Sequence, residues 1–155
     1  MEINLVAVGD RMPDWVAAGF NAYARRVRGR CRLKLIEVPA RKRPRNADFS
    51  RIAEQEGVQL LKAAPRGSRL IALDRGGRQF STGQLAKKLD GWLQTGQPVS
   101  LLVGGPEGFS AQVLEEADES WSLSSLTFAH PLVRVIAAEQ LYRAWSILEG
   151  LPYHR

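Results

Sequence analysis

The chain has 155 residues, of which 22 are Lys or Arg and 16 are Asp or Glu, so its formal net charge is +6 at pH 7. An apolar fraction of 45% in a chain of this length is enough to form the core of one folded domain, which excludes an intrinsically disordered protein. No apolar run approaches the roughly 20 residues of a membrane span, and one Cys with two His is too small a set for a structural zinc site, so we expect a cytoplasmic protein without a signal peptide, membrane span or metal.

The first forty residues predict a strand, a helix and a second strand. Ile3–Val8 is an apolar run that ends at Gly9, which is typical of a buried strand. Pro13 suits the first turn of a helix, and apolar residues at spacings of three and four give that helix one buried face. These residues are Val16, Phe20, Tyr23 and Val27. The second strand is expected over Arg32–Val38.

Basic residues are concentrated in one region of the chain. Between Arg25 and Arg45 the only acidic residue is Glu37, and the rest of the chain is slightly negative. The basic residues are Arg25, Arg26, Arg28, Arg30, Arg32, Lys34, Arg41, Lys42, Arg43 and Arg45. Such a cluster attracts phosphates, so Arg25–Lys34 and the loop Pro39–Arg45 predict a surface that faces nucleic acid. Acidic proteins or a membrane surface are alternative partners for the same charges.

The middle of the chain continues the alternation of helices and strands. Asp48 or Ala47 begins a helix that ends before Pro65, and Leu70–Leu73 follows as a short buried strand. We expect a turn over Asp74–Gly77, and then a helix capped by Thr82.

The last third predicts two more strands and two more helices. Val99–Val103 is an apolar strand apart from Ser100, followed by a helix around Ala111–Ala117, a short strand near Trp121–Leu123 and a long helix over roughly Leu132–Glu149. Strands that are buried on both faces and separated by helices indicate a largely parallel sheet with helices on both sides. The prediction is therefore a single α/β domain over residues 1–155.

Three loops follow the predicted carboxyl ends of strands, at Leu73–Gly77, Gly104–Gly108 and Leu123–Phe128. Ligands of open α/β sheets bind in the crevice outside these ends. The glycines permit close approach of backbone to a ligand, and the last loop combines hydroxyls with apolar side chains, which suits an adenine and a thioether better than a polyphosphate. Tight turns that bind no ligand explain the same residues equally well.

Several longer motifs resemble one known family. The segments Leu101–Gly108, Trp121–Ser124 and His130–Val135, continued by Ala138–Trp145 and the ending Pro152–Arg155, are similar to the ribosomal RNA large-subunit methyltransferase H family. That family belongs to the SPOUT class of methyltransferases. Val6–Gly9 and Leu73–Gly77 match as well, so the resemblance covers essentially the whole chain.

The resemblance implies a fold, a reaction and a donor site. Members are homodimers with a C-terminal trefoil knot, and they transfer methyl from S-adenosylmethionine to N3 of a pseudouridine in the ribosomal RNA of assembled ribosomes. By matching positions, it assigns eight residues to the methyl donor. They are Leu73, Gly104, Leu123, Ser124, Ser125, Leu126, Thr127 and Phe128.

Methylation of an imide nitrogen also needs a group that accepts its proton or stabilises its anion. His154 is a candidate proton acceptor, Arg155 or Arg143 could stabilise the anion or hold a phosphate, and Tyr153 could stack on a base. For each of these residues packing, dimer contact or a frayed terminus is the alternative.

Two other functions fit parts of the sequence. The basic cluster alone would also suit a non-enzymatic ribosome- or RNA-binding factor. The Gly104–Gly108 loop would also suit a small nucleotide-binding hydrolase or transferase, although it matches neither phosphate-binding glycine motif.

Overall fold

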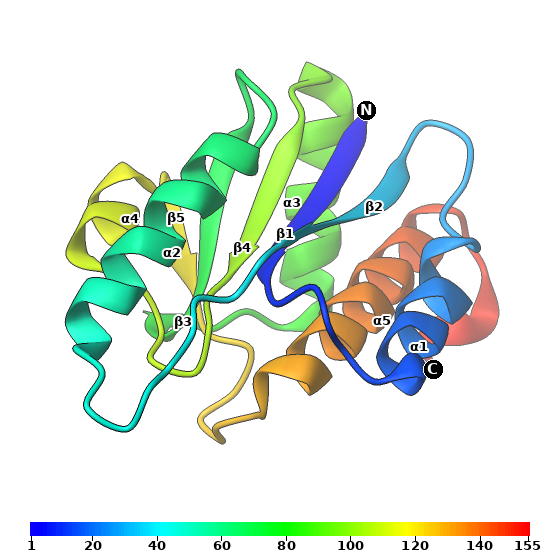
Figure 1. Ribbon diagram of the computed structural model, residues 1–155. Helices are drawn as coiled ribbons and strands as arrows, with labels where there is room; N and C mark the ends of the chain where they lie inside the picture. The colour runs from blue at the N-terminus through cyan, green and yellow to red at the C-terminus, as the bar shows by residue number, and fades with distance from the viewer.

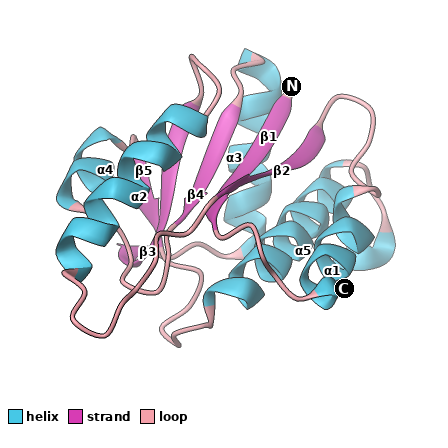
Figure 2. Ribbon diagram, viewed as in Figure 1, coloured by secondary structure: helices cyan, strands magenta, loops and turns pink.

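Five parallel strands in the order β2-β1-β4-β3-β5 form the centre of the molecule (Figures 1 and 2). The computed structural model describes residues 1–155. The strands are β1 (Glu2–Val8), β2 (Arg32–Val38), β3 (Arg69–Arg78), β4 (Val99–Val103) and β5 (Glu119–Trp121). All five strands run the same way, so their carboxyl ends lie at one edge of the sheet.

Helices cover both faces of this sheet. They are α1 (Asp14–Ala24), α2 (Phe49–Ala63), α3 (Thr82–Thr95), α4 (Ala111–Glu116) and α5 (His130–Leu148), followed by the short 3₁₀ helix η1 (Pro152–His154). In Figure 1, α1, α3 and α5 lie on one side of the strands, and α2 and α4 lie on the other. The predicted α/β class with a parallel, helix-flanked sheet is confirmed.

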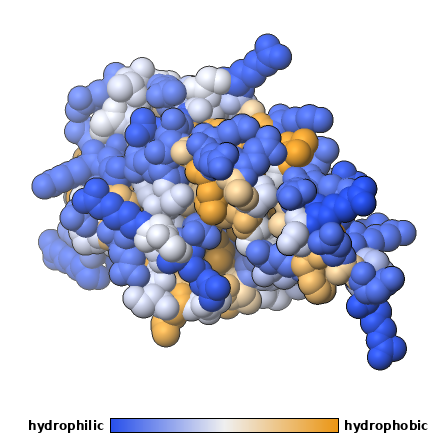
Figure 3. Space-filling model, turned by 90° about the vertical axis from the view of Figure 1, so that its left-hand side faces the viewer, coloured by the Kyte–Doolittle hydropathy of each residue, from blue (hydrophilic) through white to orange (hydrophobic).

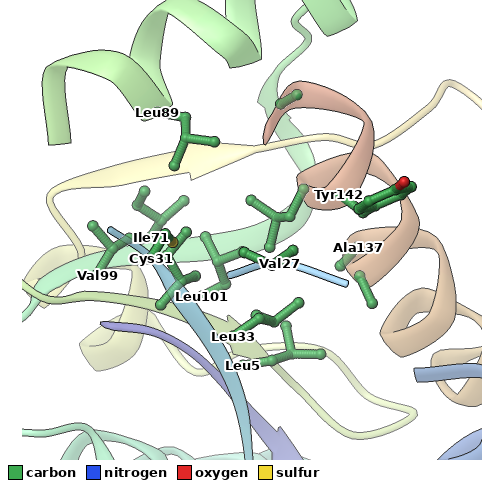
Figure 4. Close-up of a cluster of buried hydrophobic side chains, with 14 of the residues drawn as sticks. Leu5, Val27, Cys31, Leu33, Ile71, Leu89, Val99, Leu101, Ala137 and Tyr142 are labelled. Carbon is green, nitrogen blue, oxygen red and sulfur yellow. The ribbon is translucent and has the colours of Figure 1, made fainter. Parts of the chain in front are cut away.

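The alternation of side chains along β1 produces two separate cores. Ile3, Leu5 and Ala7 belong to the larger cluster under α1, α3 and α5, whereas Val6 and Val8 belong to the smaller one under α2 and α4. Figure 4 shows the larger cluster, in which Leu5 lies close to Leu33 and Leu101. Burial on both faces explains why β1 is apolar at nearly every position from Ile3 to Val8, with Asn4 the one exception.

Helix ends differ from the prediction at two places. Ser81, not Thr82, caps α3, because its side chain accepts from the backbone N–H of Gln84 while the Gln84 side chain accepts from the Ser81 N–H. The first helix ends at Ala24, before Val27. The amides of Arg26 and Val27 donate to carbonyls three residues back, which is a tighter turn than that of an α-helix. Val27 is nevertheless buried, as its spacing predicted.

The expected turn over Asp74–Gly77 is wrong, because β3 continues to Arg78. Pairing with β5 breaks after Leu73 and resumes at Arg78 opposite Trp121. A Cβ on Gly77 would lie 2.5 Å from the Ser120 carbonyl carbon, so only glycine permits this approach of the two backbones. The strand expected near Trp121–Leu123 correspondingly begins two residues earlier, at Glu119.

The surface agrees with a helix-covered sheet. The side of the molecule at the left of Figure 1 is mostly hydrophilic, with hydrophobic residues gathered around its centre (Figure 3). None of the helices combines the length and apolarity that crossing a membrane requires.

Candidate functional site

A pocket of about 390 Å³ lies at the carboxyl ends of β3 and β4. Its volume is in the range of small-molecule sites in proteins. Three stretches line it, together with the start of α5: Leu73–Arg75, Val103–Phe109 and the segment Ser122–Phe128. The three stretches that the sequence placed at the strand ends therefore meet around one cavity, although Leu73–Arg75 lies within β3 and not in a loop.

The Gly104–Gly108 loop is a tight turn that leaves no room for side chains at its base. The Gly108 amide donates to the Gly105 carbonyl at 2.9 Å, and Gly108 has a left-handed φ of 77°. A Cβ on Gly104 would lie 2.9 Å from the Gly108 carbonyl oxygen. The glycines therefore fix the backbone that forms this wall of the pocket.

The segment Ser122–Phe128 is held on both sides by side-chain hydrogen bonds. Ser124 accepts from the amide of Leu126 at 3.0 Å, which shapes the segment internally. Arg75 donates to the Thr127 hydroxyl at 3.2 Å and Gln79 donates to the Ser125 hydroxyl at 3.0 Å, so the end of β3 supports it from outside.

Most residues assigned to the donor by the resemblance line this one pocket. They are Leu73, Gly104, Leu123, Ser124, Leu126, Thr127 and Phe128. Ser125 is not among the lining residues, because its hydroxyl is bonded to Gln79. Leu126 is 72% exposed, which leaves a large apolar side chain at the mouth of the pocket available to a ligand or a partner.

Charged side chains of both signs also line the pocket. Asp74 and Glu107 supply carboxylates, while Arg75 and His130 supply nitrogen donors. Hydrogen bonds from Arg43 lower the pKa of Glu107, and burial together with the charges of Arg134 and Arg43 lowers the pKa of His130. In the sequence His130 stood out only as the first residue of the motif His130–Val135. No group of three or more His, Cys, Asp or Glu side chains is arranged to hold a metal ion.

Arg43 does not belong to the solvent-facing basic cluster in which the sequence placed it. Its Nη2 donates to Glu56 Oε1 at 2.8 Å and to Glu107 Oε2 at 2.6 Å, and its Nε contacts both oxygens of Glu107 at 3.0 Å. Its side chain is only 21% exposed. The interpretation of Arg43 as a surface cation is therefore corrected: it is an internal ion-pair partner.

One signal in the sequence could have revealed this network. Glu56 follows Ile52 and precedes Leu60 at spacings of four, so a carboxylate stands on the apolar face of α2. Its side chain is 3% exposed. A buried carboxylate requires a cation, and only the fold identifies that cation as Arg43.

Arg134 anchors the beginning of α5 to the carboxyl ends of β1 and β2. The side chain is fully buried and donates to the carbonyls of Val8 and Gly9 at 3.1 and 2.6 Å. Its Nη1 also bonds Glu37 Oε2 at 2.6 Å. The anchor fixes the point from which α5 leaves the pocket.

The predicted catalytic residues lie elsewhere. Arg143, Tyr153, His154 and Arg155 are not among the residues that line the pocket. The α5 helix leaves the carboxyl edge of the sheet, and the tail ends beside α1 and α5 (Figure 1). Within one chain the structure does not bring these residues to the loops that line the pocket.

The tail is packed against α5 rather than frayed. The Tyr153 ring lies 4.5 Å from that of Tyr142, and its hydroxyl donates to Glu139 at 3.2 Å. Arg143 donates to the same Glu139 oxygen at 2.6 Å, which raises the pKa of the Arg143 guanidinium. His154 Nδ1 contacts the Leu151 carbonyl at 2.9 Å, and its ring is otherwise exposed.

The chain is similar to known proteins over essentially its whole length. A family model described as a predicted SPOUT methyltransferase matches residues 1–154. The chain is 56% identical over 155 residues to the ribosomal RNA large subunit methyltransferase H of Thioalkalivibrio sulfidiphilus (strain HL-EbGR7). That alignment covers 100% of this chain and 99% of the relative.

Proposed function

The chain belongs to the SPOUT methyltransferase family, and from this premise we propose that it methylates N3 of a pseudouridine in large-subunit ribosomal RNA. S-adenosylmethionine is the proposed methyl donor, and the assembled ribosome is the proposed substrate. The observation that carries the proposal is the pocket at the carboxyl ends of β3 and β4, where the loops assigned to the donor converge. The name of the full-length relative supports the class of RNA.

The chemistry of the pocket fits S-adenosylmethionine. Leu73, Leu126 and Phe128 offer apolar surface for the adenine, and the backbone around Gly104 offers hydrogen bonds for its edge. The amino-acid part of the donor carries a positive ammonium and a negative carboxylate. Asp74 and Glu107 are complementary to the ammonium, and Arg75 is complementary to the carboxylate. The eighth assigned residue, Ser125, would act by holding the loop.

When bound, S-adenosylmethionine supplies an electrophilic methyl group on a positively charged sulfur. The protein's main contribution is to hold the acceptor nitrogen in line with that group. His154 is proposed to accept the N3 proton, with Arg155 or Arg143 stabilising the negative charge and Tyr153 stacking on the base. Because Tyr153 is bonded to Glu139 and its pKa is raised by burial and by that carboxylate, it stays protonated at neutral pH.

A homodimer reconciles the two separated sets of residues. The tail packs on its own α5, away from its own pocket, so we propose that it completes the pocket of a partner subunit. A C-terminal trefoil knot is proposed with it, on the ground of the family match over residues 1–154. A ribosomal substrate implies a cytoplasmic enzyme.

The basic cluster, without Arg43, is proposed to contact ribosomal RNA phosphates. The cluster has eight exposed members without an ion pair: Arg25, Arg26, Arg28, Arg30, Arg32, Arg41, Lys42 and Arg45. Contacts of this kind position a protein on RNA without reading its sequence.

Calorimetry with S-adenosylmethionine and with ATP, run side by side on the purified protein, tests the function. We expect S-adenosylmethionine to bind at one site per chain and ATP to bind at least tenfold more weakly, a difference of about 1.4 kcal/mol. Preference for ATP would indicate a nucleotide-binding enzyme instead. Binding of neither ligand would leave a ribosome-binding factor without methyltransferase activity.

The nucleotide is tested separately. Assembled ribosomes are incubated with protein and labelled donor, and digests of the ribosomal RNA are analysed by mass spectrometry. A methyl group on a pseudouridine of the large subunit is the expected product. Methylation of any other nucleotide would contradict the proposed target while leaving the donor site intact.

A further inference from the structure

We propose that Arg43 is a positioning residue for methyl-donor binding: it holds the Gly104–Gly108 loop in the form that receives the donor. The proposal rests on the proposed function, since it concerns the same pocket. Arg43 itself does not line that pocket and acts through Glu107, which does.

The bonds of Arg43 leave its guanidinium no free edge. Nε and Nη2 form a two-pronged contact with the Glu107 carboxylate at 2.6–3.0 Å, the geometry that a planar guanidinium makes best. Nη1 donates to the Arg41 carbonyl at 2.8 Å. An arginine engaged on all sides and mostly shielded from water is unsuited to contact an RNA phosphate, unlike its exposed neighbours Lys42 and Arg45.

Glu56 holds Arg43 from the opposite side. One oxygen of Glu56 accepts from Arg43 Nη2 at 2.8 Å, and the other accepts from the backbone amide of Arg41 at 2.9 Å. Because α2 carries this buried carboxylate, the position of Arg43 is set by the folded core and not by a mobile loop. The two carboxylates and the guanidinium form a bridge from α2 to the glycine loop.

The bridge reaches the backbone of the pocket wall. A Cβ on Gly105 would lie 2.8 Å from both Arg43 Nη2 and Glu56 Oε1, so the network packs directly on that residue. The next two residues end in Glu107, whose carboxylate is the other end of the bridge. Loss of Arg43 would free the loop and leave the buried Glu56 carboxylate without its cation.

Arg43→Ala tests the inference by calorimetry with S-adenosylmethionine and S-adenosylhomocysteine. We expect both ligands to bind about tenfold more weakly, in line with the loss of charged hydrogen bonds. The kcat at saturating donor should change much less than the KM for donor. Arg43→Lys keeps the charge but not the two-pronged contact, so its donor affinity should lie between those of the wild type and Arg43→Ala.

Lys42→Ala and Arg45→Ala are the matched controls, because they remove a flanking, exposed cation and should leave donor affinity unchanged. Donor affinity of Arg43→Ala equal to that of the wild type would overturn the proposal. If the wild type itself fails to bind S-adenosylmethionine, the proposed function fails, which is a distinguishable result.

A double variant separates positioning from general destabilisation. If Arg43 acts through Glu107, Arg43→Ala with Glu107→Ala should bind the donor no more weakly than Glu107→Ala alone. If Arg43→Ala weakens donor binding as much in the Glu107→Ala background as in the wild type, Arg43 does not act through Glu107. Arg43→Lys, the milder change, keeps the test available if Arg43→Ala does not fold, since loss of the two-pronged contact should still weaken donor binding.

Discussion

Arg134 shows how one residue can decide the stability of the region behind the pocket. It is a fully buried cation on α5 that bonds two carbonyls at the end of β1 and a carboxylate on β2. We predict that Arg134→Met lowers the free energy of unfolding by about 3–5 kcal/mol, because the carbonyls of Val8 and Gly9 lose their donor. Urea denaturation of the wild type and of Arg134→Met measures this difference in the free energy of unfolding.

The matched control is Glu37→Gln. In Glu37→Gln the side-chain amide oxygen can still accept from Arg134, and the carbonyls of Val8 and Gly9 keep their donor, so the loss should be smaller, about 1–2 kcal/mol. Equal stability of the two variants would show that the charge pair, and not the capping of the β1 carbonyls, is the source of the effect.

At the level of elements, β3, β5 and α3 are joined at Glu119. Its carboxylate accepts from Arg69 at 2.7 Å, from Lys88 at 2.9 Å and from the Trp121 indole at 2.8 Å. Burial alone would raise its pKa, but these hydrogen bonds outweigh burial and lower the pKa to about 2. The ionised form of Glu119 is therefore the one that the fold stabilises.

Stability should consequently fall in acid. Below the ordinary glutamate pKa of 4.5 the unfolded chain takes up a proton that the folded chain binds only near pH 2, so the contribution is complete above about pH 5 and is lost towards pH 2. Thermal melts across this range should show a steeper decline for the wild type than for Glu119→Gln. Parallel declines would contradict the prediction.

The elements also show what the sequence can and cannot reveal. The apolar runs of β1 and β4 and the Asp48 cap of α2 were predictable, because each depends on local pattern. The continuation of β3 to Arg78 was not, since it depends on Gly77 meeting the backbone of a distant strand. The residues that the resemblance assigns to a methyl donor could be named from the sequence, and most of them line one pocket, whereas the partner of the buried Glu56 required the fold.

At the scale of the whole molecule, the tail of each chain lies away from the pocket at the ends of β3 and β4. Homodimers in which each tail serves the other pocket predict complementation between two inactive variants. Gly104→Val would block the pocket, since even a Cβ there lies 2.9 Å from the Gly108 carbonyl oxygen, and His154→Ala would remove the proposed base. Co-expression of the two should restore methylation, which neither variant shows alone.

Two results would contradict this arrangement. Full turnover by His154→Ala at saturating donor would remove histidine as the proton acceptor. Absence of activity in mixed dimers, when mass spectrometry confirms that they form, would indicate that each tail serves its own subunit.

The strand order has a consequence for how the chain reaches its native state. The central pair of the sheet joins Ile3 to Val99, and α5 bonds Val8 across 126 residues. Contacts so distant in sequence make folding slow, because a long loop must close before the pairing stabilises anything. During synthesis β1 can pair early with β2, but its other edge stays open until β4 has been made. A newly made chain therefore passes through a stage with an unpaired, apolar strand edge, where aggregation is the competing outcome.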